Sequence, residues 1–371
     1  MPSIAETEIA HVTDAVRSGW VSSIGPYIQE FETSFAKYCG TRYALTVSNG
    51  TTGLHLALRA LGIKAGDKVI IPDLTFIATA NAVNYTGATP VIVDIEPDTL
   101  CMCPRALERA ITPRTRAIIP VHLYGHPADM DAINDIAARH DLIVIEDAAE
   151  AHGAEYKGRK TGSLGHCGVF SFYGNKIITS GEGGMLTTDD EQVWAAAKLL
   201  RDHAMSPTKR YWHEEIGYNY RMTNLQAALG VAQLKRIDDF ISRRNEIVGW
   251  YRKRLGHING LRLNHRSPWA KTACWMLCFE LPGLNEQTRA AFMASLRERG
   301  IDSRPYFYPV SDMPMYATAA TPVAHRISQT GLNLPLFHDL TEENVDYICS
   351  VVTELLDPRA VERWIGLAAG P

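Results

Sequence analysis

The stretch Gly168-Val-Phe-Ser-Phe-Tyr-Gly-Asn-Lys176 joins an apolar run to a single lysine, and the glycine-rich Gly181-Glu-Gly-Gly184 follows it. The apolar run predicts a buried strand. A lysine directly after such a strand, with glycines clearing space around it, suits a Schiff-base lysine, because a desolvated amine loses its proton more easily and becomes nucleophilic. A lysine considered alone is far more often an ordinary surface residue. The assignment of Lys176 therefore depends on the rest of the chain.

The chain on the N-terminal side of this stretch alternates between amphipathic segments and short apolar runs. The amphipathic segments predict helices at 31–38, 51–61 and 130–140. The apolar runs predict strands at 43–47, 68–71, 89–93, 117–121 and 141–145. Apolar strands that alternate with helices indicate an α/β fold whose parallel sheet is covered by helices on both faces.

The chain on the C-terminal side has a different pattern. A long, charged amphipathic helix is predicted over 224–255, and it leads to strand-like 275–281, a helix over 286–299 and the segment 301–308. We interpret this part as a smaller α/β domain joined through the long helix. Near the N-terminus, Gly19-Trp20 and Gly25-Pro26 break helices, which predicts an irregular arm. The predicted organisation is an arm at 1–25, a large domain at 26–238 and a small domain at 239–371.

The composition is that of an average soluble globular chain, with 371 residues, of which 46% are hydrophobic and 21% charged. The formal net charge is -4, so the chain has no basic excess for nucleic acid, and its apolar content excludes disorder. The uncharged stretch 74–93 is long enough to suggest a membrane helix. Its four threonines, two asparagines, Gly87 and Pro90 instead favour a buried part of a soluble fold. We expect neither a nucleic-acid partner nor a membrane.

The cysteines and histidines give no sign of export or of a metal site. None of the seven cysteines forms a CxxC pair, which indicates reduced thiols in a cytoplasmic protein. Residues 1–14 carry acids early and lack the basic and apolar regions of a signal peptide. No carboxylate joins His122, His126 or His152 at ligand spacing, so these histidines are expected to be structural or pocket-lining rather than metal ligands.

Two further motifs bear on the role of Lys176. Ser48-Asn-Gly-Thr-Thr52 lies between a predicted strand and a helix, where Gly50 lets the backbone approach a ligand and Thr51 offers a hydroxyl beside free N–H groups. Such a motif suits a phosphate, although it is most often only a helix cap. Ile143-Val-Ile-Glu-Asp147 ends a strand in a carboxylate, at the edge where open α/β sheets bind ligands. This aspartate could hold a cationic ring nitrogen, cap a helix or bind a metal.

Five segments occur in the order found in the DegT/DnrJ-type sugar aminotransferases, which the chain resembles from Gly19 to Pro335. The segments are SNGTTGLHLAL (48–58), PDLTFIATANAV (72–83), EDAAEAHGA (146–154), FSFYGNKIITSGEGG (170–184) and GYNYRMTNLQAA (217–228). The resemblance implies a pyridoxal-phosphate enzyme of fold type I that aminates a keto sugar. It also implies a large domain with a mostly parallel central sheet and a smaller C-terminal α/β domain.

The resemblance further implies a role for each candidate residue of the site. Lys176 would form the Schiff base with pyridoxal 5'-phosphate and shuttle the proton between the substrate carbon and the cofactor. Asp147 would keep the pyridine nitrogen protonated, so that the ring acts as an electron sink. Glu150 lies where the family places a side chain near the phenolic oxygen, commonly glutamine, so it must be protonated or point elsewhere. The remaining contacts would be Gly50, Thr51 and Ser171 on the phosphate and Phe76 stacked on the ring.

The partners also follow from the resemblance. Asn219 matches a residue that reaches the phosphate of the neighbouring subunit's cofactor, which implies a homodimer with shared active sites. The implied donor is glutamate, which leaves as 2-oxoglutarate, and the favoured acceptor is GDP-4-keto-6-deoxymannose, which would give GDP-perosamine. One stretch matches a family loop near the sugar nucleotide, and another presents a cation and aromatic rings that could meet a diphosphate or a base. Both could equally pack at the subunit interface. Their candidate residues are Trp20 and Ser22 in the first and Arg304 and Tyr306 in the second.

Several alternatives stay open at this point. Related 3-dehydratases carry a histidine in place of Lys176, so the lysine favours transamination over dehydration. The same chemistry could act on a 3-keto sugar, a UDP- or dTDP-sugar or a cyclitol ketone. A regulatory protein that binds the cofactor without transferring an amino group is a different class, and the lack of a DNA-binding segment weighs against it. A last alternative is an α/β protein in which Lys176 has no functional role, and it is disfavoured because Asp147, Ser171 and Lys176 occur together.

Overall fold

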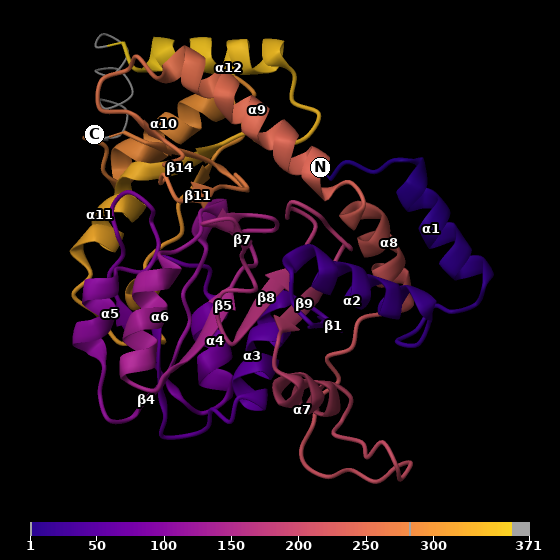
Figure 1. The fold of residues 1–371 in the computed structure, drawn as a ribbon. Helices are drawn as coiled ribbons and strands as arrows, with labels where there is room; N and C mark the ends of the chain where they lie inside the picture. The colour runs from indigo at the N-terminus through magenta and orange to yellow at the C-terminus, as the bar shows by residue number, and fades with distance from the viewer. Residues whose placement is uncertain (1, 282, 358–371) are drawn as a thin grey trace.

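A seven-stranded sheet forms the centre of the computed structural model, which describes residues 2–281 and 283–357 (Figure 1). The strand β9 is antiparallel to both of its neighbours, and the other adjacent pairs are parallel. The predicted α/β fold with a mostly parallel sheet is therefore confirmed. In spatial order the strands are β1 (Tyr43–Val47), β9 (Gly184–Thr188), β8 (Cys167–Ser171), β5 (Ile143–Asp147), β4 (Thr115–Ile118), β2 (Lys68–Pro72) and β3 (Thr89–Val93).

Helices cover both faces of this sheet, and each face has its own apolar core. Alternation along a strand assigns side chains to the two cores, so Ile70 packs on one face while Val69 and Ile71 pack on the other. One face carries α3 (Gly50–Ala60), α4 (Ala78–Tyr85) and α7 (Glu191–Arg201). The other face carries α2 (Pro26–Cys39), α5 (Pro104–Ala110), α6 (Met130–Arg139) and α8 (Asn224–Leu234). Burial on both faces explains why the strands read as continuous apolar runs.

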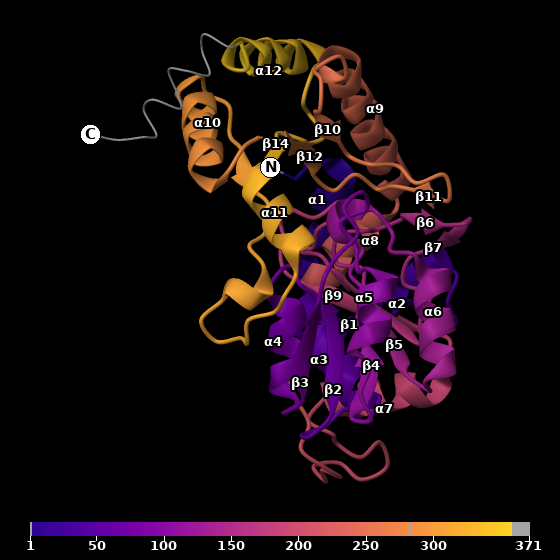
Figure 2. The ribbon, with the colours of Figure 1, turned by 90° about the vertical axis from the view of Figure 1, so that its left-hand side faces the viewer.

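A second layer lies above the carboxyl ends of these strands (Figure 2). Its antiparallel sheet has the order β10 (Arg262–Leu263), β12 (Leu277–Glu280), β14 (Gly331–Leu334) and β13 (Arg304–Pro305). Its helices are α9 (Ile237–Leu255), α10 (Glu286–Glu298), α11 (Pro322–Thr330) and α12 (Glu342–Leu355). A small three-stranded sheet of β11 (Ala270–Lys271), β6 (Glu155–Tyr156) and β7 (Arg159–Lys160) pairs residues of the two parts. Residues 282 and 358–371 of the predicted small domain lie outside the described residues.

Two expectations for the helices are wrong. Residues 6–17 form the helix α1 (Glu6–Arg17) rather than an irregular arm, because the helix breakers follow it instead of interrupting it. The long helix expected at 224–255 is two helices, α8 and α9, which are separated at Lys235 and Arg236. Both differences share one contact: the buried carboxylate of Glu8 on α1 accepts hydrogen bonds from Gln233 and from Arg236, each at 2.8 Å.

Two aspartates attach the chain between β13 and α11 to the large sheet. The carboxylate of Asp73, directly after β2, accepts hydrogen bonds from the backbone N–H of Ser311 (2.8 Å), from its hydroxyl (2.7 Å) and from the hydroxyl of Thr321. Asp94, directly after β3, accepts the N–H groups of Val323 and Ala324 in the first turn of α11. These anchors keep β13 and the residues after it at the carboxyl edge of the large sheet.

The cysteines and the lengths of the helices were also determined for the described part of the chain. All seven cysteines are buried and none is in a disulfide. Among residues 2–281 and 283–357, no helix combines the length and the apolar character that crossing a bilayer requires.

Candidate active site

A cavity of about 480 Å³ opens at the carboxyl edge of the large sheet. Four of its wall segments lie at or just after the end of a strand of the large sheet: the start of α3 follows β1, Phe76 follows β2, Asp147 ends β5 and Ser171 ends β8. The carboxyl ends of neighbouring strands point to the same edge, so residues far apart in sequence meet there. The predicted residues that line this cavity are Gly50, Thr51, Phe76, Asp147, Glu150, Ser171, Lys176 and Arg304.

The amine of Lys176 lies in the wall of this cavity. Its Nζ is 3.7 Å from Oε1 of Glu150 and 3.9 Å from the centroid of the Trp275 ring. Burial lowers the pKa of Lys176, while the negative charges of Glu150 and Asp147 raise it in part. The lysine is thus a buried amine with a lowered pKa, as a nucleophilic lysine requires.

Asp147 is the last residue of β5 and is 6% exposed. Its Oδ2 accepts the hydroxyl of Thr79 at 2.7 Å and its Oδ1 accepts the N–H of Ala149 at 3.2 Å. Burial raises the pKa of Asp147, whereas these two hydrogen bonds and the positive charge of Lys176 lower it. The hydrogen bonds fix the direction of the carboxylate, and a cationic group in the cavity would favour its ionised form.

Glu150 points toward the lysine rather than away from the site. Its Oε2 accepts the N–H of Tyr124 at 2.9 Å, and Tyr124 itself has the left-handed φ of 52°. Burial raises the pKa of Glu150 to about 7, although the charge of Lys176 and the Tyr124 hydrogen bond lower it. Near neutral pH this carboxyl group therefore exists in both protonation states. Such a carboxyl can either donate or accept a hydrogen bond in the cavity.

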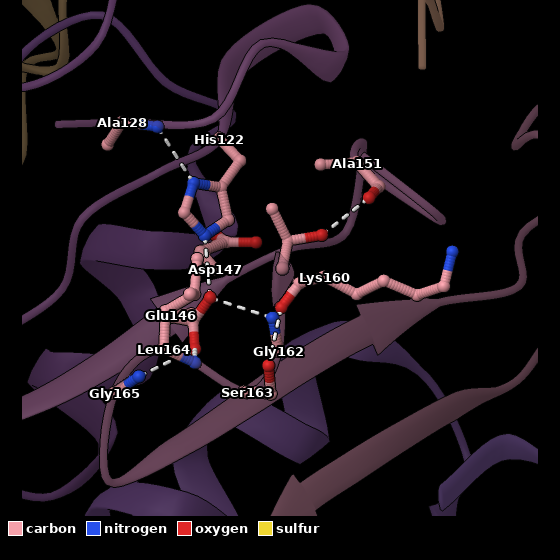
Figure 3. A network of polar contacts seen from close by, with 12 residues as sticks. His122, Ala128, Glu146, Asp147, Ala151, Lys160, Gly162, Ser163, Leu164 and Gly165 are labelled. Atoms are coloured by element: carbon pink, nitrogen blue, oxygen red, sulfur yellow. Dashed lines mark hydrogen bonds and ion pairs between the residues drawn. The ribbon is translucent and has the colours of Figure 1, made fainter. Parts of the chain in front are cut away.

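A second buried carboxylate, Glu146, lies behind the site and organises the end of β5 (Figure 3). Its Oε1 accepts the N–H groups of Leu164 and Gly165, and its Oε2 accepts that of Gly162. His122 completes the network, because its Nδ1 accepts the N–H of Ala128 (3.0 Å) and its Nε2–H donates to Glu146 at 2.9 Å.

The backbone of the same histidine is hydrogen-bonded to the carboxyl end of β5. The N–H of His122 donates to the carbonyl of Asp147 at 3.0 Å, and the N–H of Asp147 donates to the carbonyl of Pro120 at 2.9 Å. Figure 3 shows how Glu146 and Asp147, adjacent on one strand, point in different directions. The network therefore holds the strand end that presents Asp147 to the cavity.

The start of α3 forms a narrow concave surface. Asn49 caps the helix by accepting the N–H of Thr52 at 2.9 Å, so the first N–H groups of the helix face the cavity without intrahelical partners. A Cβ placed on Gly50 would lie 3.0 Å from the Cβ of Ser171, and one on Gly184 would lie 2.7 Å from the Asn49 carbonyl. These glycines let α3 approach β8 and β9 closely, and the approach at Gly50 places a helix N-terminus beside the hydroxyl of Ser171.

Comparison with known proteins decides what this arrangement belongs to. The profile of the DegT/DnrJ/EryC1/StrS aminotransferase family matches residues 2–353. The chain belongs to this family. The match confirms the resemblance expected from the sequence, and it confirms an aminotransferase rather than a regulatory protein.

Relatives and solved structures agree with the family assignment. A GDP-perosamine synthase of Caulobacter vibrioides is 48% identical over 96% of this chain and 97% of its own length, and one of Escherichia coli O157:H7 is 45% identical over 95% and 96%. The structure of DesV from S. venezuelae has a TM-score of 0.88 and 37% identity over 94% of this chain and 93% of its own. The PLP-form of Spr1654 from Streptococcus pneumoniae has a TM-score of 0.90 and 29% identity over 96% and 98%.

The cofactor of this aminotransferase is pyridoxal 5'-phosphate, and the cavity has the groups that it requires. The buried amine of Lys176 suits the aldehyde, and the carboxylate of Asp147 suits a protonated ring nitrogen. The N-terminus of α3, next to Gly50 and Ser171, suits a phosphate. No group of three or more His, Cys, Asp or Glu side chains in the described part of the chain is placed to hold a metal ion.

Four predicted residues lie elsewhere in the single chain. Asn219 is exposed on the loop before α8, where its Oδ1 accepts the Nε–H of Arg221 at 3.1 Å. Trp20 and Ser22 lie outside the cavity, and their carbonyls accept hydrogen bonds from Asn224. Tyr306 is buried behind Tyr124, with ring centroids 5.1 Å apart, whereas its neighbour Phe307 lines the cavity.

Sequence reasoning did not identify three groups of the site. Thr79 bonds to Asp147, Trp275 contacts the lysine and Glu146 supports the strand end. Thr79 had the weak signal of a polar residue on the buried side of an amphipathic segment. Glu146 had a stronger signal, since an acid within an apolar strand must be paired. Trp275 had none, because its contact depends on how the second layer is placed.

Proposed function

We propose that this aminotransferase transfers the amino group of glutamate to the C4 keto group of GDP-4-keto-6-deoxymannose, which yields 2-oxoglutarate and GDP-perosamine. The observation that carries the proposal is the buried amine of Lys176 between the carboxyl groups of Glu150 and Asp147 in one cavity. The acceptor is supported by three relatives that bear the name GDP-perosamine synthase and are 48%, 45% and 40% identical over at least 95% of this chain.

The residues of the cavity would divide the work as follows. Pyridoxal phosphate, when bound, supplies an electron sink and carries the amino group from the donor to the acceptor. Lys176 would remove the proton from the α-carbon of glutamate and, in the second half of the reaction, deliver a proton to C4 of the sugar. Asp147 would hold the protonated ring nitrogen, while the first turn of α3 and Ser171 would bind the phosphate. Phe76, which is 53% exposed at the cavity, would cover the ring.

We further propose that two copies of the chain share each active site. Asn219 is exposed and lies outside the cavity of its own chain, so it is available to a second copy. The segment that precedes it also exposes the apolar side chains of Tyr211, Trp212 and Ile216, which a dimer would cover. A cytoplasmic location is supported by the seven buried thiols, none of which forms a disulfide.

The first test is the visible absorption spectrum of the purified protein, recorded before and after glutamate and then with each of a set of nucleotide keto sugars. Glutamate should bleach the band of the bound pyridoxal form, and the correct acceptor should restore it. Recovery with GDP-4-keto-6-deoxymannose alone supports the proposal. Recovery only with another ketone keeps the chemistry and rejects this acceptor. A spectrum that glutamate leaves unchanged rejects glutamate as the donor.

A further inference from the structure

A second cavity, of about 680 Å³, lies beside the first and extends between the loop at 174–176 and α12. The two cavities have part of their walls in common, so Lys176 borders both. The far wall of the second cavity comes from the segment before β13 and from α12, including Ser303 and Tyr347. The residues that line both cavities are Asn175, Lys176, Trp275, Met276, Arg304 and Asn333.

Arg244, on α9, borders the second cavity with a guanidinium that has no carboxylate partner in the described part of the chain. Its Nη1 donates to the carbonyl of Trp275 at 2.9 Å and to that of Leu336 at 3.4 Å. These contacts use one of its three nitrogens, which leaves Nε and Nη2 for a ligand. Burial lowers the pKa of Arg244 to about 10, and the nearby thiol of Cys274 raises it only in part.

The other charged residues that line the second cavity are also mostly basic. Arg304 borders both cavities and is exposed, so the second cavity has two arginines in its wall. Among the described residues that line the second cavity, Asp302 is the single carboxylate, and it is exposed. A cavity with two arginines and one exposed acid in its wall is suited to an anionic ligand, since guanidinium groups bind carboxylates and phosphates well.

We propose that this second cavity binds the carboxylates of the amino donor, a dicarboxylate, through Arg244 and Arg304. The identity of the donor as glutamate rests on the proposed function. The chemistry favours a carboxylate over a diphosphate at this place. In an amino acid the α-carboxylate is attached to the very carbon whose proton Lys176 moves, so a cation that binds it must lie beside the lysine. In the proposed acceptor, the diphosphate is attached to C1, across the sugar ring from C4.

The test is calorimetric titration of the holoenzyme with glutarate, a dicarboxylate that has no amine or ketone and cannot react, and separately with GDP. Arg244→Gln and Arg304→Gln should each weaken glutarate binding at least about tenfold and leave GDP binding unchanged. Arg244→Lys keeps the charge and should lose less. The matched control is Arg243→Gln, because Arg243 on the same helix also donates to two carbonyls, of His338 and Leu340, but does not border the cavity.

The outcomes separate the two proposals. Unchanged glutarate binding in both glutamine variants overturns the inference, and so does a loss of GDP binding that equals or exceeds the loss for glutarate. A loss in Arg243→Gln as large as that in Arg244→Gln also overturns it, since the effect would then be structural. If Arg244→Gln does not fold, Arg244→Lys and Arg304→Gln decide. Failure of every sugar acceptor would reject the proposed function without changing these binding results.

Discussion

The Nζ of Lys176 lies 3.9 Å from the centroid of the Trp275 ring, although the two residues belong to different layers of the molecule. The indole N–H donates to the carbonyl of Asn175 at 2.8 Å, which fixes the ring next to the lysine. An aromatic face and the carboxyl group of Glu150 both favour the ammonium form, and burial opposes it. The second layer therefore contributes directly to the environment of the reactive amine.

Removal of the hydroxyl of Thr79 is expected to weaken the role of Asp147 without disturbing the fold. Thr79→Val deletes the hydrogen bond of 2.7 Å to the buried carboxylate, so the pKa of Asp147 should rise further. A hydrogen bond to a charged group contributes about 1.5–3 kcal/mol, which predicts a loss of cofactor affinity and turnover of about 10- to 100-fold.

Cofactor titration and steady-state turnover would measure this effect. Thr86→Val is the matched control, since the hydroxyl of Thr86 is buried as well but donates to the carbonyl of Val83. Equal behaviour of the two variants would contradict a specific role for Thr79.

The cofactor-free protein should lose stability with rising pH because of Glu150. The folded state raises the pKa of this carboxyl from 4.5 to about 7, so between these values the folded state binds more protons than the unfolded one. The stabilising contribution is complete below about pH 4.5 and is lost as the pH rises through 7. From pH 5 to pH 8, the free energy of unfolding of the wild type should fall by about 2–3 kcal/mol relative to Glu150→Gln.

Denaturant titrations of both proteins at several pH values would check this difference. Glu155→Gln serves as the control, because ion pairs lower the pKa of Glu155 and its contribution changes only below the pH range measured. Parallel curves for the wild type and Glu150→Gln would show that Glu150 does not titrate in this range.

Complementation between inactive variants would reveal a shared site. Lys176→Ala should bind the cofactor and show no turnover, since the proposed base is lost. Asn219→Ala should bind the cofactor weakly, if Asn219 acts on the site of the second copy. In a mixed dimer of the two variants, one of the two sites then has both residues intact. Mixing after partial denaturation should restore up to about a quarter of the wild-type activity, as half of the dimers are mixed.

The same experiment contains its own control. Mixing Lys176→Ala with Asp147→Asn, which change two residues of the same cavity in one chain, should restore no activity. In each mixed dimer one site lacks Lys176 and the other lacks Asp147, so no site is intact. Recovery of activity in this second mixture, or its absence in the first, would argue against the assignment of Asn219 to the partner's site.

Three buried histidines should make the protein sensitive to acid. Burial lowers the pKa of His55 and of His126 to about 4 and that of His152 to about 3. Below pH 6.5 the unfolded chain binds protons that the folded protein does not, so this stability is present above pH 6.5 and is lost as the pH falls toward the folded values. Between about pH 6 and pH 4.5, each histidine should lower the free energy of unfolding by up to about 1.4 kcal/mol for each unit that the pH falls.

A single substitution can isolate one of these slopes. His55→Gln should reduce the fall in the free energy of unfolding by about one histidine's share, whereas His140→Gln, at an exposed position, should leave it unchanged. Denaturation at pH 6.5 and 5.0 would distinguish the two. If both variants follow the wild type, the acid sensitivity has another source.

The large sheet and the residues that line the cavity at its carboxyl edge were predicted from the sequence for the same physical reason. Strands covered on both faces are apolar throughout, so a polar residue at or soon after the end of such a run lies at the edge where ligands bind. Asp147 is the last residue of β5, and Lys176 follows the end of β8 by a short loop. Other features depend on contacts between distant parts of the chain. The split between α8 and α9 follows from the binding of Arg236 to Glu8, and the amphipathic pattern runs through it without a break. The positions of Trp275 and Arg244 follow from how the second layer packs.

The buried carboxylate of Asp73 has a consequence for how the molecule opens. Residues 311–321 connect strands of the second layer, but Ser311 and Thr321 at their two ends are hydrogen-bonded to Asp73 of the large sheet. Rigid rotation of the second layer as one body would break these bonds at Ser311 and Thr321, so hinge motion is confined to chain on either side of them. The amide proton of Ser311 should therefore exchange with solvent as slowly as those of β2, which makes this segment part of the same cooperative unit as the catalytic edge.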